Sequence, residues 1–337
     1  MNRTALSLAP LLFLSAVAAC STETIVKSDP AAPAATGPAD PGATPPGATP
    51  PTAPVDEPPW KETKPLVSDV RAISCPSDSE VHVATSTGLY RLEGGAWKTV
   101  AAGDFYAVSM TTATAGFAGG EGVFLQRSGS EWSALAAASW KVRAIYTNAD
   151  GAFVGGTGYM YIGKNQLPVE PLVWFVANDL TLRDEYAFGS RLTAGAVKSI
   201  AGSGAYAVAS TGSYLQTWSG VAWEDAPSDY FLSGGYRSVA MISGYAFATN
   251  GRQIAEPQGT QYDPVGQSPD IAALFTYKTN LLAVGAGGAV LRRSPKGDYT
   301  GDDVGQAVDL TAGCATSTGN LWVAGGKRVF RRRDALQ

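Results

Sequence analysis

A repeated pattern of short strands, running from residue 66 to residue 335, constrains the fold more than any other feature of this chain. Each unit has a short apolar strand, a second apolar strand ending in small residues and Gly, a third strand with alternating apolar residues, and a turn often followed by Trp. The turns are 34, 36, 54, 39, 37 and 39 residues apart, and a period of about 40 with about four strands per unit is typical of propeller blades. The turn positions are Gly88, Gly122, Gly158, Gly212, Gly251, Gly288 and Lys327.

The first strand of each unit is the one expected to line the centre of a propeller. Seven such segments occur, so the sequence predicts an all-β, seven-bladed β-propeller of four-stranded antiparallel blades. The predicted inner strands are VRAISC (70–75), FYAVSM (105–110), VRAIYT (142–147), AVKSIA (196–201), YRSVAM (236–241), IAALFT (271–276) and AVDLTA (307–312).

The two ends of the repeat region are expected to meet. The last unit stops after its third strand, at residues 331–334, whereas PWKETK (59–64) resembles the fourth strands AWKTVA and EWSALA of other units. We therefore predict that Trp60 to Lys64 completes the last blade and closes the ring, which removes exposed sheet edges.

Two cysteines, Cys75 and Cys314, each lie at the end of a predicted inner strand, in the first and last units. These units are neighbours in a closed ring, and disulfides form and persist in oxidising compartments outside the cytoplasm. We predict a disulfide between them, and the alternative is two unpaired buried cysteines.

The repeats resemble the broad bacterial propeller superfamily that contains sialidase-like and photosystem-assembly-factor-like repeats and the propellers of two-component regulators. LLAVGAGGAVLRR (281–293) carries most of the resemblance, which extends over residues 59–335. It implies a propeller fold and says little about activity. The sialidase Asp-box, Ser-x-Asp-x-Gly-x-x-Trp, does not occur in the sequence, which weighs against sialidase activity.

The N-terminus has the features of a secretory signal. Arg3 precedes an apolar stretch that is too short to span a bilayer, and Val-Ala-Ala-Cys at 17–20 resembles the bacterial lipobox. That resemblance implies a signal peptide at 1–19 and a diacylglyceryl group and an acylated amine on Cys20, which would anchor the chain in a membrane. The alternative is an ordinary secretory signal with an incidental cysteine. Ser21 after the cysteine favours an outer-membrane lipoprotein of the cell envelope, with the leaflet left open.

Residues 20–58 are expected to be a disordered linker between the anchor and the propeller domain at 59–337. The segment is rich in Pro, Ala and Thr and has no apolar periodicity, so it cannot bury a core. A Pro-rich ligand or a glycosylated stalk is the alternative to a spacer.

Composition argues against several kinds of partner and site. The net charge is −4, so no overall basic field attracts nucleic acid, and we expect no nucleic-acid partner. The chain has one histidine, His82, which disfavours a histidine metal site or a His-based triad. We expect a monomer with no cofactor and no metal site.

One interval between units is longer than the others and carries an insertion near residues 170–192. An apolar run followed by charged residues is expected to dock a partner, because long loops on a rigid scaffold often hold function. The alternative is that these residues extend the blade strands and pack in the core. The candidate partner-binding residues are Trp174, Phe175, Asp179, Arg183 and Asp184.

Three charged groups are further candidates. GDYTGDDVGQAVD (297–309) resembles a calcium loop but departs from its pattern, so a solvated turn is the preferred interpretation. The basic C-terminal strand with Arg328, Arg331, Arg332 and Arg333 is interpreted as a charged blade edge, or else as a contact to anionic glycans or lipid headgroups. On three inner strands, the cations that could gather at one channel mouth are Arg71, Arg143 and Lys198.

No carboxylate pair or Ser-His-Asp set stands out, so no catalytic residue is assigned and a binding role is favoured over an enzyme. The leading hypothesis is a lipid-anchored envelope protein whose propeller binds a protein or a glycan. The alternatives are a propeller hydrolase or lyase acting on a polysaccharide, and a structural role in envelope assembly.

Overall fold

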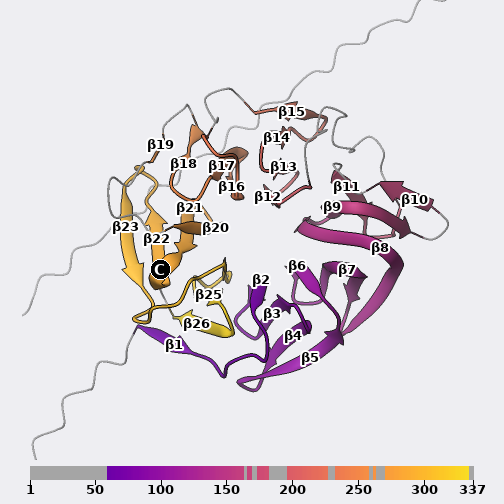
Figure 1. Cartoon of the computed structure of the whole chain (residues 1–337), viewed down its shortest axis with the longest axis horizontal. Helices are drawn as coiled ribbons and strands as arrows, with labels where there is room; N and C mark the ends of the chain where they lie inside the picture. Colours follow the sequence, from indigo (N-terminus) through magenta and orange to yellow (C-terminus); the bar gives the residue numbers. More distant parts are fainter. Residues whose placement is uncertain are drawn as a thin grey trace, which may run out of the picture. The chain divides into compact units, whose positions relative to one another are not determined.

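The computed structural model describes residues 59–162, 165–168, 173–181, 196–226, 232–257, 261–262 and 270–333. Its elements are β-strands, with a short 3-10 turn, η4 (Ala286–Gly288). The strands form antiparallel sheets arranged as blades around a centre (Figure 1). Among the described residues, no helix has the length and hydrophobicity needed to cross a membrane.

Five of the sheets have four strands each, paired in antiparallel order from the centre outward. The first blade is β2 (Val70–Ser77), β3 (Glu80–Thr85), β4 (Gly88–Glu93) and β5 (Ala96–Ala102). The next three blades of this kind are β12 (Ser199–Ser203), β13 (Tyr206–Ser210), β14 (Leu215–Trp218) and β15 (Trp223–Asp225); β16 (Ser238–Ile242), β17 (Tyr245–Thr249), β18 (Ile254–Ala255) and β19 (Gln261–Tyr262); and β20 (Ile271–Tyr277), β21 (Asn280–Gly285), β22 (Ala289–Arg293) and β23 (Tyr299–Asp303). The last blade is β24 (Ala312–Ala315), β25 (Leu321–Gly325), β26 (Arg328–Arg332) and β1 (Trp60–Glu62).

The prediction of seven four-stranded blades is wrong, because the described strands form six sheets. The sixth sheet, which we call the wide blade, merges two predicted units through one 17-residue strand, β8. The first part of β8 pairs with β7 and the second part pairs with β9. The strands of the wide blade are β6 (Phe105–Thr112), β7 (Ala115–Ser128), β8 (Glu131–Thr147), β9 (Gly151–Ile162), β10 (Asn165–Pro168) and β11 (Val173–Ala177).

The sequence of β8 explains this merging. EWSALAAASWKVRAIYT contains neither Gly nor Pro, so nothing in it ends one strand and turns the chain into the next. The first blade, in contrast, is separated from β6 by Gly103, which has a φ of 143°. A blade boundary expected between residues 135 and 142 is therefore replaced by continuous strand.

The predicted inner strands line the central channel, and the wide blade contributes two of them, β6 and the second part of β8. Serine hydroxyls join inner strands of neighbouring blades. The Ser74 hydroxyl accepts a hydrogen bond from the Met110 backbone N–H (3.1 Å), and the Ser238 hydroxyl accepts one from that of Leu274 (3.0 Å). The last inner strand begins later than predicted, at Ala312.

The core lies between adjacent blades, where apolar side chains of one sheet pack on the next. Glycines in the second strand of a unit make this approach possible. A Cβ on Gly155 would lie 2.6 Å from Cγ1 of Val197, which stands before β12. Gly119 is in the same position relative to Val142. The small residues that end these strands are therefore required for close packing, between blades at Gly155 and within the wide blade at Gly119.

The ring is closed in the way that the sequence predicts. β1 pairs with β26, so that Trp60 lies opposite Arg332 and Glu62 opposite Phe330. The Trp60 indole N–H also donates to Asp302 Oδ2 of the neighbouring blade (3.2 Å). The N-terminal strand of the described chain thus becomes the outer strand of the last blade, beside the first blade (Figure 1).

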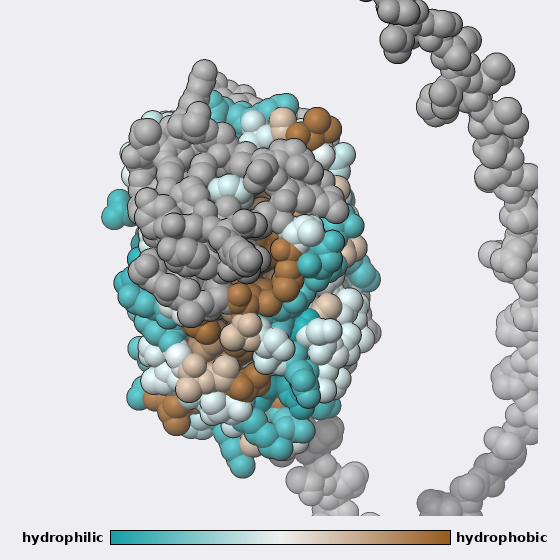
Figure 2. All heavy atoms as spheres, turned by 90° about the vertical axis from the view of Figure 1, so that its right-hand side faces the viewer, coloured by the Kyte–Doolittle hydropathy of each residue, from teal (hydrophilic) through white to brown (hydrophobic). Residues whose placement is uncertain are grey.

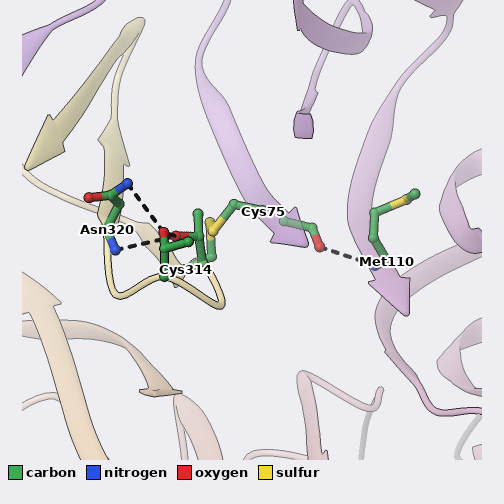
Figure 3. The surroundings of a disulfide bond; sticks show 7 residues. Cys75, Met110, Cys314 and Asn320 are labelled. Atoms are coloured by element: carbon green, nitrogen blue, oxygen red, sulfur yellow. Dashed lines mark hydrogen bonds between the residues drawn. A yellow bond between two sulfur atoms is a disulfide. The ribbon is translucent and has the colours of Figure 1, made fainter. Parts of the chain in front are cut away.

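The predicted disulfide between Cys75 and Cys314 is confirmed. Cys75 lies on β2 and Cys314 on β24, with their Cα atoms 5.9 Å apart (Figure 3). Both residues border the central channel. The disulfide therefore joins the first and last blades covalently at the centre, while β1, whose chain leads into the first blade, pairs within the last blade at the rim.

Candidate functional site

One mouth of the central channel gathers positive charge. At this mouth the inner strands begin, and a residue near the start of each inner strand borders a cavity of about 270 Å³. Arg71 on β2 and Arg143 on β8 are joined there by Lys198 and Arg237, which directly precede β12 and β16. We call these four residues the cationic mouth.

Three of the four cations were predicted to meet at a channel mouth, and the structure brings them together. Arg237 was missed, although YRSVAM (236–241) carries Arg at the same position as VRAISC (70–75). Aligning these two strands by their second residue would have found it. The remaining inner strands place Tyr106, Ala272 and Thr311 at this mouth.

Two of the cations are paired with carboxylates. Arg71 forms an ion pair with Asp104, and Arg237 Nη1 lies 2.8 Å from Asp270 Oδ2. In both cases the aspartate directly precedes the next inner strand around the ring. The Arg71 guanidinium also lies over the Tyr106 ring, 4.2 Å from its centroid. These contacts fix Arg71 and Arg237 and offset their charge.

Arg143 and Lys198 have no such partner. The positions equivalent to the two aspartates are Ala196 and Gly235. Both side chains are exposed, and neither forms an ion pair with a residue that the structure describes. The Arg143 guanidinium carbon lies 5.4 Å from the centroid of the Tyr106 ring, which orients it.

The opposite arc of the mouth is acidic. Asp69 and Asp309 precede the inner strands of the first and last blades, and the residues that would pair with them by the same rule are Thr311 and Ala272. Asp309 Oδ1 accepts a hydrogen bond from the Gly287 backbone N–H (3.1 Å). The mouth is therefore electrically asymmetric, with positive charge over the wide blade and the blade of β12. An anionic group would bind on that side.

At the same mouth, the carboxylates of Asp104 and Glu121 lie on either side of the Tyr106 hydroxyl. The hydroxyl donates to Asp104 Oδ2 (3.2 Å) and approaches Glu121 Oε2 (3.4 Å). The Lys141 ammonium hydrogen-bonds Glu121 and lowers the pKa of that carboxyl. Glu121 is therefore held in its ionised form, which suits a charged binding surface better than a general acid.

Acid–base and metal chemistry find little support in the described residues. They contain no cluster of three or more His, Cys, Asp or Glu side chains that could hold a metal ion. His82 is fully buried on β3, and burial, followed by the charges of Arg127 and Arg91, lowers its pKa to about 3. It lies away from the mouth and is neutral at physiological pH.

The apolar residues of the predicted docking insertion are buried in the structure and do not form a surface element. Trp174 and Phe175 lie on β11, paired with β9, and their side chains are only 8% and 1% exposed. Trp174 packs within the wide blade and Phe175 packs against the blade of β12, so the alternative of an extended blade strand describes them. On this side of the ring, hydrophobic residues form a narrow, broken strip among hydrophilic ones (Figure 2).

The polar residues of the insertion are less defined. Asp179 lies in the turn after β11, and its carboxylate accepts hydrogen bonds from the backbone N–H and the hydroxyl of Thr181 (3.0 and 2.7 Å). Arg183 and Asp184 lie outside the described residues, as does Cys20.

The two remaining charged segments are parts of blades. Residues 299–303 form β23, where Asp302 is ion-paired with Arg332, so this part of the calcium-loop candidate is a strand rather than a solvated turn. The basic C-terminal segment forms β26, which lies between β25 and β1. Its interpretation as a blade edge is wrong, because β1 covers that edge.

The fold is similar to those of solved β-propellers. The structure of YCF48 bound to D1 peptide superposes with a TM-score of 0.61 at 16% identity, over 82% of this chain and 98% of that chain. The WD40 β-propeller domain of Doa1 gives 0.63 at 12% identity, over 82% and 96%. Streptogramin B lyase gives 0.62 at 10% identity, over 81% and 98%. The sequence matches no protein-family model, and no curated protein matches it.

Proposed function

We propose that this chain is a lipid-anchored binding or scaffold protein of the cell envelope, which holds an acidic segment of a partner protein at the cationic mouth. The observation that carries the proposal is the pair Arg143 and Lys198. These are consecutive cations around the ring, both exposed, and neither forms an ion pair with a described carboxylate. An anionic group arriving there meets two cations that have no ion-pair partner among the described residues.

The rigid scaffold supports a binding role. The inner strands are fixed by sheet pairing, by the serine hydrogen bonds between blades and by the ring closure. A surface that is already ordered loses little conformational entropy when a ligand binds. YCF48, which has the same kind of fold, is bound to a D1 peptide in its solved structure, and this supports a peptide ligand here.

The envelope location rests on the N-terminal sequence. A lipid on Cys20 and a Pro-rich spacer at 20–58 would present the propeller at a membrane surface. Metabolic labelling with a fatty-acid analogue tests this part, since Cys20→Ser should abolish the label. A label that persists in that variant would contradict it.

Site-specific photo-cross-linking in intact cells tests the cationic mouth. A photoreactive residue in place of Ala272, which borders the mouth, should capture an acidic peptide segment of a partner. The double variant Arg143→Glu/Lys198→Glu should lose the cross-link. Lys278→Glu makes the same charge change at the far end of β20 and should keep it.

The outcomes separate the possibilities. If the cross-link still forms in the double variant, the cationic mouth is not the binding surface. A cross-linked anionic glycan, in place of a peptide, would keep the mouth but change the class of partner.

A polysaccharide hydrolase or lyase is the second candidate, because one observation favours it. Tyr106 stands between Asp104 and Glu121 and beneath Arg71 and Arg143, and such mixed groups occur in propeller enzymes without a linear motif. The ionised state of Glu121 argues for binding instead. Turnover of a polysaccharide by the full chain, abolished by Tyr106→Phe, would establish the enzyme.

A further inference from the structure

A second pocket lies at the seam of the ring, where the closing strand β1 meets the first blade. It has a volume of about 460 Å³. One wall comes from the closing segment with Lys61 and Lys64, and Leu92 near the end of β4 forms another part. Trp322, Arg331 and Arg333 of the last blade complete the lining that matters here. We call it the seam pocket.

The seam pocket is strongly cationic. Lys61, Lys64 and Arg333 are exposed, and none of them forms an ion pair with a described residue. The carboxylate in the wall, Glu62, is engaged by Arg328, whose Nε and Nη2 lie 2.7 and 2.5 Å from its oxygens. That contact lowers the pKa of Glu62, and the Arg328 guanidinium offsets the negative charge of the carboxylate. Lys61, Lys64 and Arg333 therefore have no ion-pair partner among the described residues.

The wall also contains an unsatisfied donor. Trp322 is 1% exposed, and its indole N–H has no hydrogen-bond partner among the described residues. The Arg331 guanidinium carbon lies 5.2 Å from the centroid of the Trp322 ring. A buried N–H without an acceptor is unfavourable, so a ligand oxygen or a bridging water that reached it would be stabilising.

We propose that the seam pocket binds a phosphate group. Phosphate supplies concentrated negative charge and several acceptor oxygens, which match three lysine and arginine side chains and an N–H donor. Leu92, which is half-buried, offers an apolar contact for the group attached to the phosphate. The phosphate of an anionic lipid headgroup and that of a soluble phosphorylated sugar share this chemistry. The site is separate from the cationic mouth and does not depend on the function proposed for it.

The test uses residues 20–337, the form expected after cleavage of the signal peptide, with Cys20→Ser, so that neither acyl chains nor the apolar segment at 1–19 contacts the membrane. Glycerol 1-phosphate is titrated while the indole N–H signals are followed by NMR, and Trp322→Phe identifies the Trp322 signal. We expect a saturable shift of that signal. Lys61→Gln/Arg333→Gln should weaken the apparent affinity at least tenfold, whereas Lys278→Gln, on a distant turn, should not change it.

Two further arms identify the source and the chemistry. Co-sedimentation with phosphatidylglycerol vesicles, lost in the double variant, would assign a lipid headgroup. Binding of glycerol 1-phosphate without vesicle binding would assign a soluble phosphorylated ligand. Glycerate, which carries a carboxylate, should bind at least tenfold more weakly.

The proposal is overturned if neither glycerol 1-phosphate nor vesicles bind, if the double variant binds as well as the parent, or if glycerate binds equally. Because the double variant changes two exposed side chains, it should unfold at the same temperature as the parent. That melting temperature is the folding control, and it keeps the test valid even if Trp322→Phe misfolds.

Discussion

Removing the Cys75–Cys314 disulfide should destabilise the propeller without unfolding it. The bridge joins residues 239 apart in the sequence. For a loop of that length, the chain-entropy relation gives about 5 kcal/mol at 25 °C, and measured losses are usually about 2–4 kcal/mol. We therefore expect the double variant Cys75→Ala/Cys314→Ala to lose about 3–5 kcal/mol, which corresponds to a melting temperature lower by roughly 5–9 °C for a domain of this size.

Urea unfolding followed by tryptophan fluorescence measures the loss, again in the Cys20→Ser background so that Cys75 and Cys314 are the only cysteines. Reduced parent protein is the matched control. It keeps both cysteine side chains in place, so it should lose the same free energy as the double variant if the crosslink itself is responsible. Two titratable thiols in the unreduced protein, or a double variant as stable as the parent, would refute the reasoning.

Three further predictions concern stability. His82 has a pKa of about 3 in the folded protein because it is buried, so below its unfolded value of about 6.5 the unfolded state binds the extra proton. The free energy of unfolding should then fall by up to about 1.4 kcal/mol per pH unit from pH 6.5 toward 4, and a flat urea midpoint over that range in buffers of matched ionic strength would contradict it. Trp60→Ala removes a buried side chain, 5% exposed, from the closing strand and should lower the free energy of unfolding by about 3–5 kcal/mol. Val67→Ala, at an exposed position, should change it by less than about 0.5 kcal/mol. Equal effects of the two variants in urea titration would argue against a structural role for β1. Gly155→Ala should lower the free energy of unfolding by about 1–3 kcal/mol through overpacking against Val197. Adding Val197→Ala to that variant should recover part of the loss. Purely additive effects of the two substitutions in a double-mutant cycle would show that the two side chains do not touch.

Much of the architecture was readable from the repeat. The inner strands, the closing strand at Trp60 and the Cys75–Cys314 bridge all follow from a pattern that is repeated around a ring, since a position identified in one unit predicts the same position in the next. The blade count did not follow, because counting units assumes that each ends in a turn. β8 has no Gly or Pro between Glu131 and Thr147, so its two parts remain one strand.

The candidate site was only partly predictable for a related reason. Residue type and register placed Arg71, Arg143 and Lys198 at one mouth, but their pairing depends on which blade follows which. Comparing Asp104 and Asp270 with Ala196 and Gly235 requires the ring order, which the sequence alone supplies only once the inner strands are aligned. Burial was harder to foresee. Trp174 and Phe175 stand in an apolar run that fits a docking loop as well as a core strand, and only the pairing of β11 with β9 decides between them.

The way the ring closes also determines how the protein would respond to a pull. Any load transmitted along the chain into residue 59 reaches β1 first, and β1 is held to β26 along three residue pairs at the outer rim. These three pairs can separate one after another. The inner strands, in contrast, are hydrogen-bonded within their blades and to inner strands of neighbouring blades. Behind β1, the Cys75–Cys314 bond sits at the hub and joins β2 to β24. Under load, β1 should therefore detach from β26 before any other strand. The disulfide would still hold the first and last blades together, and the cationic mouth would stay intact.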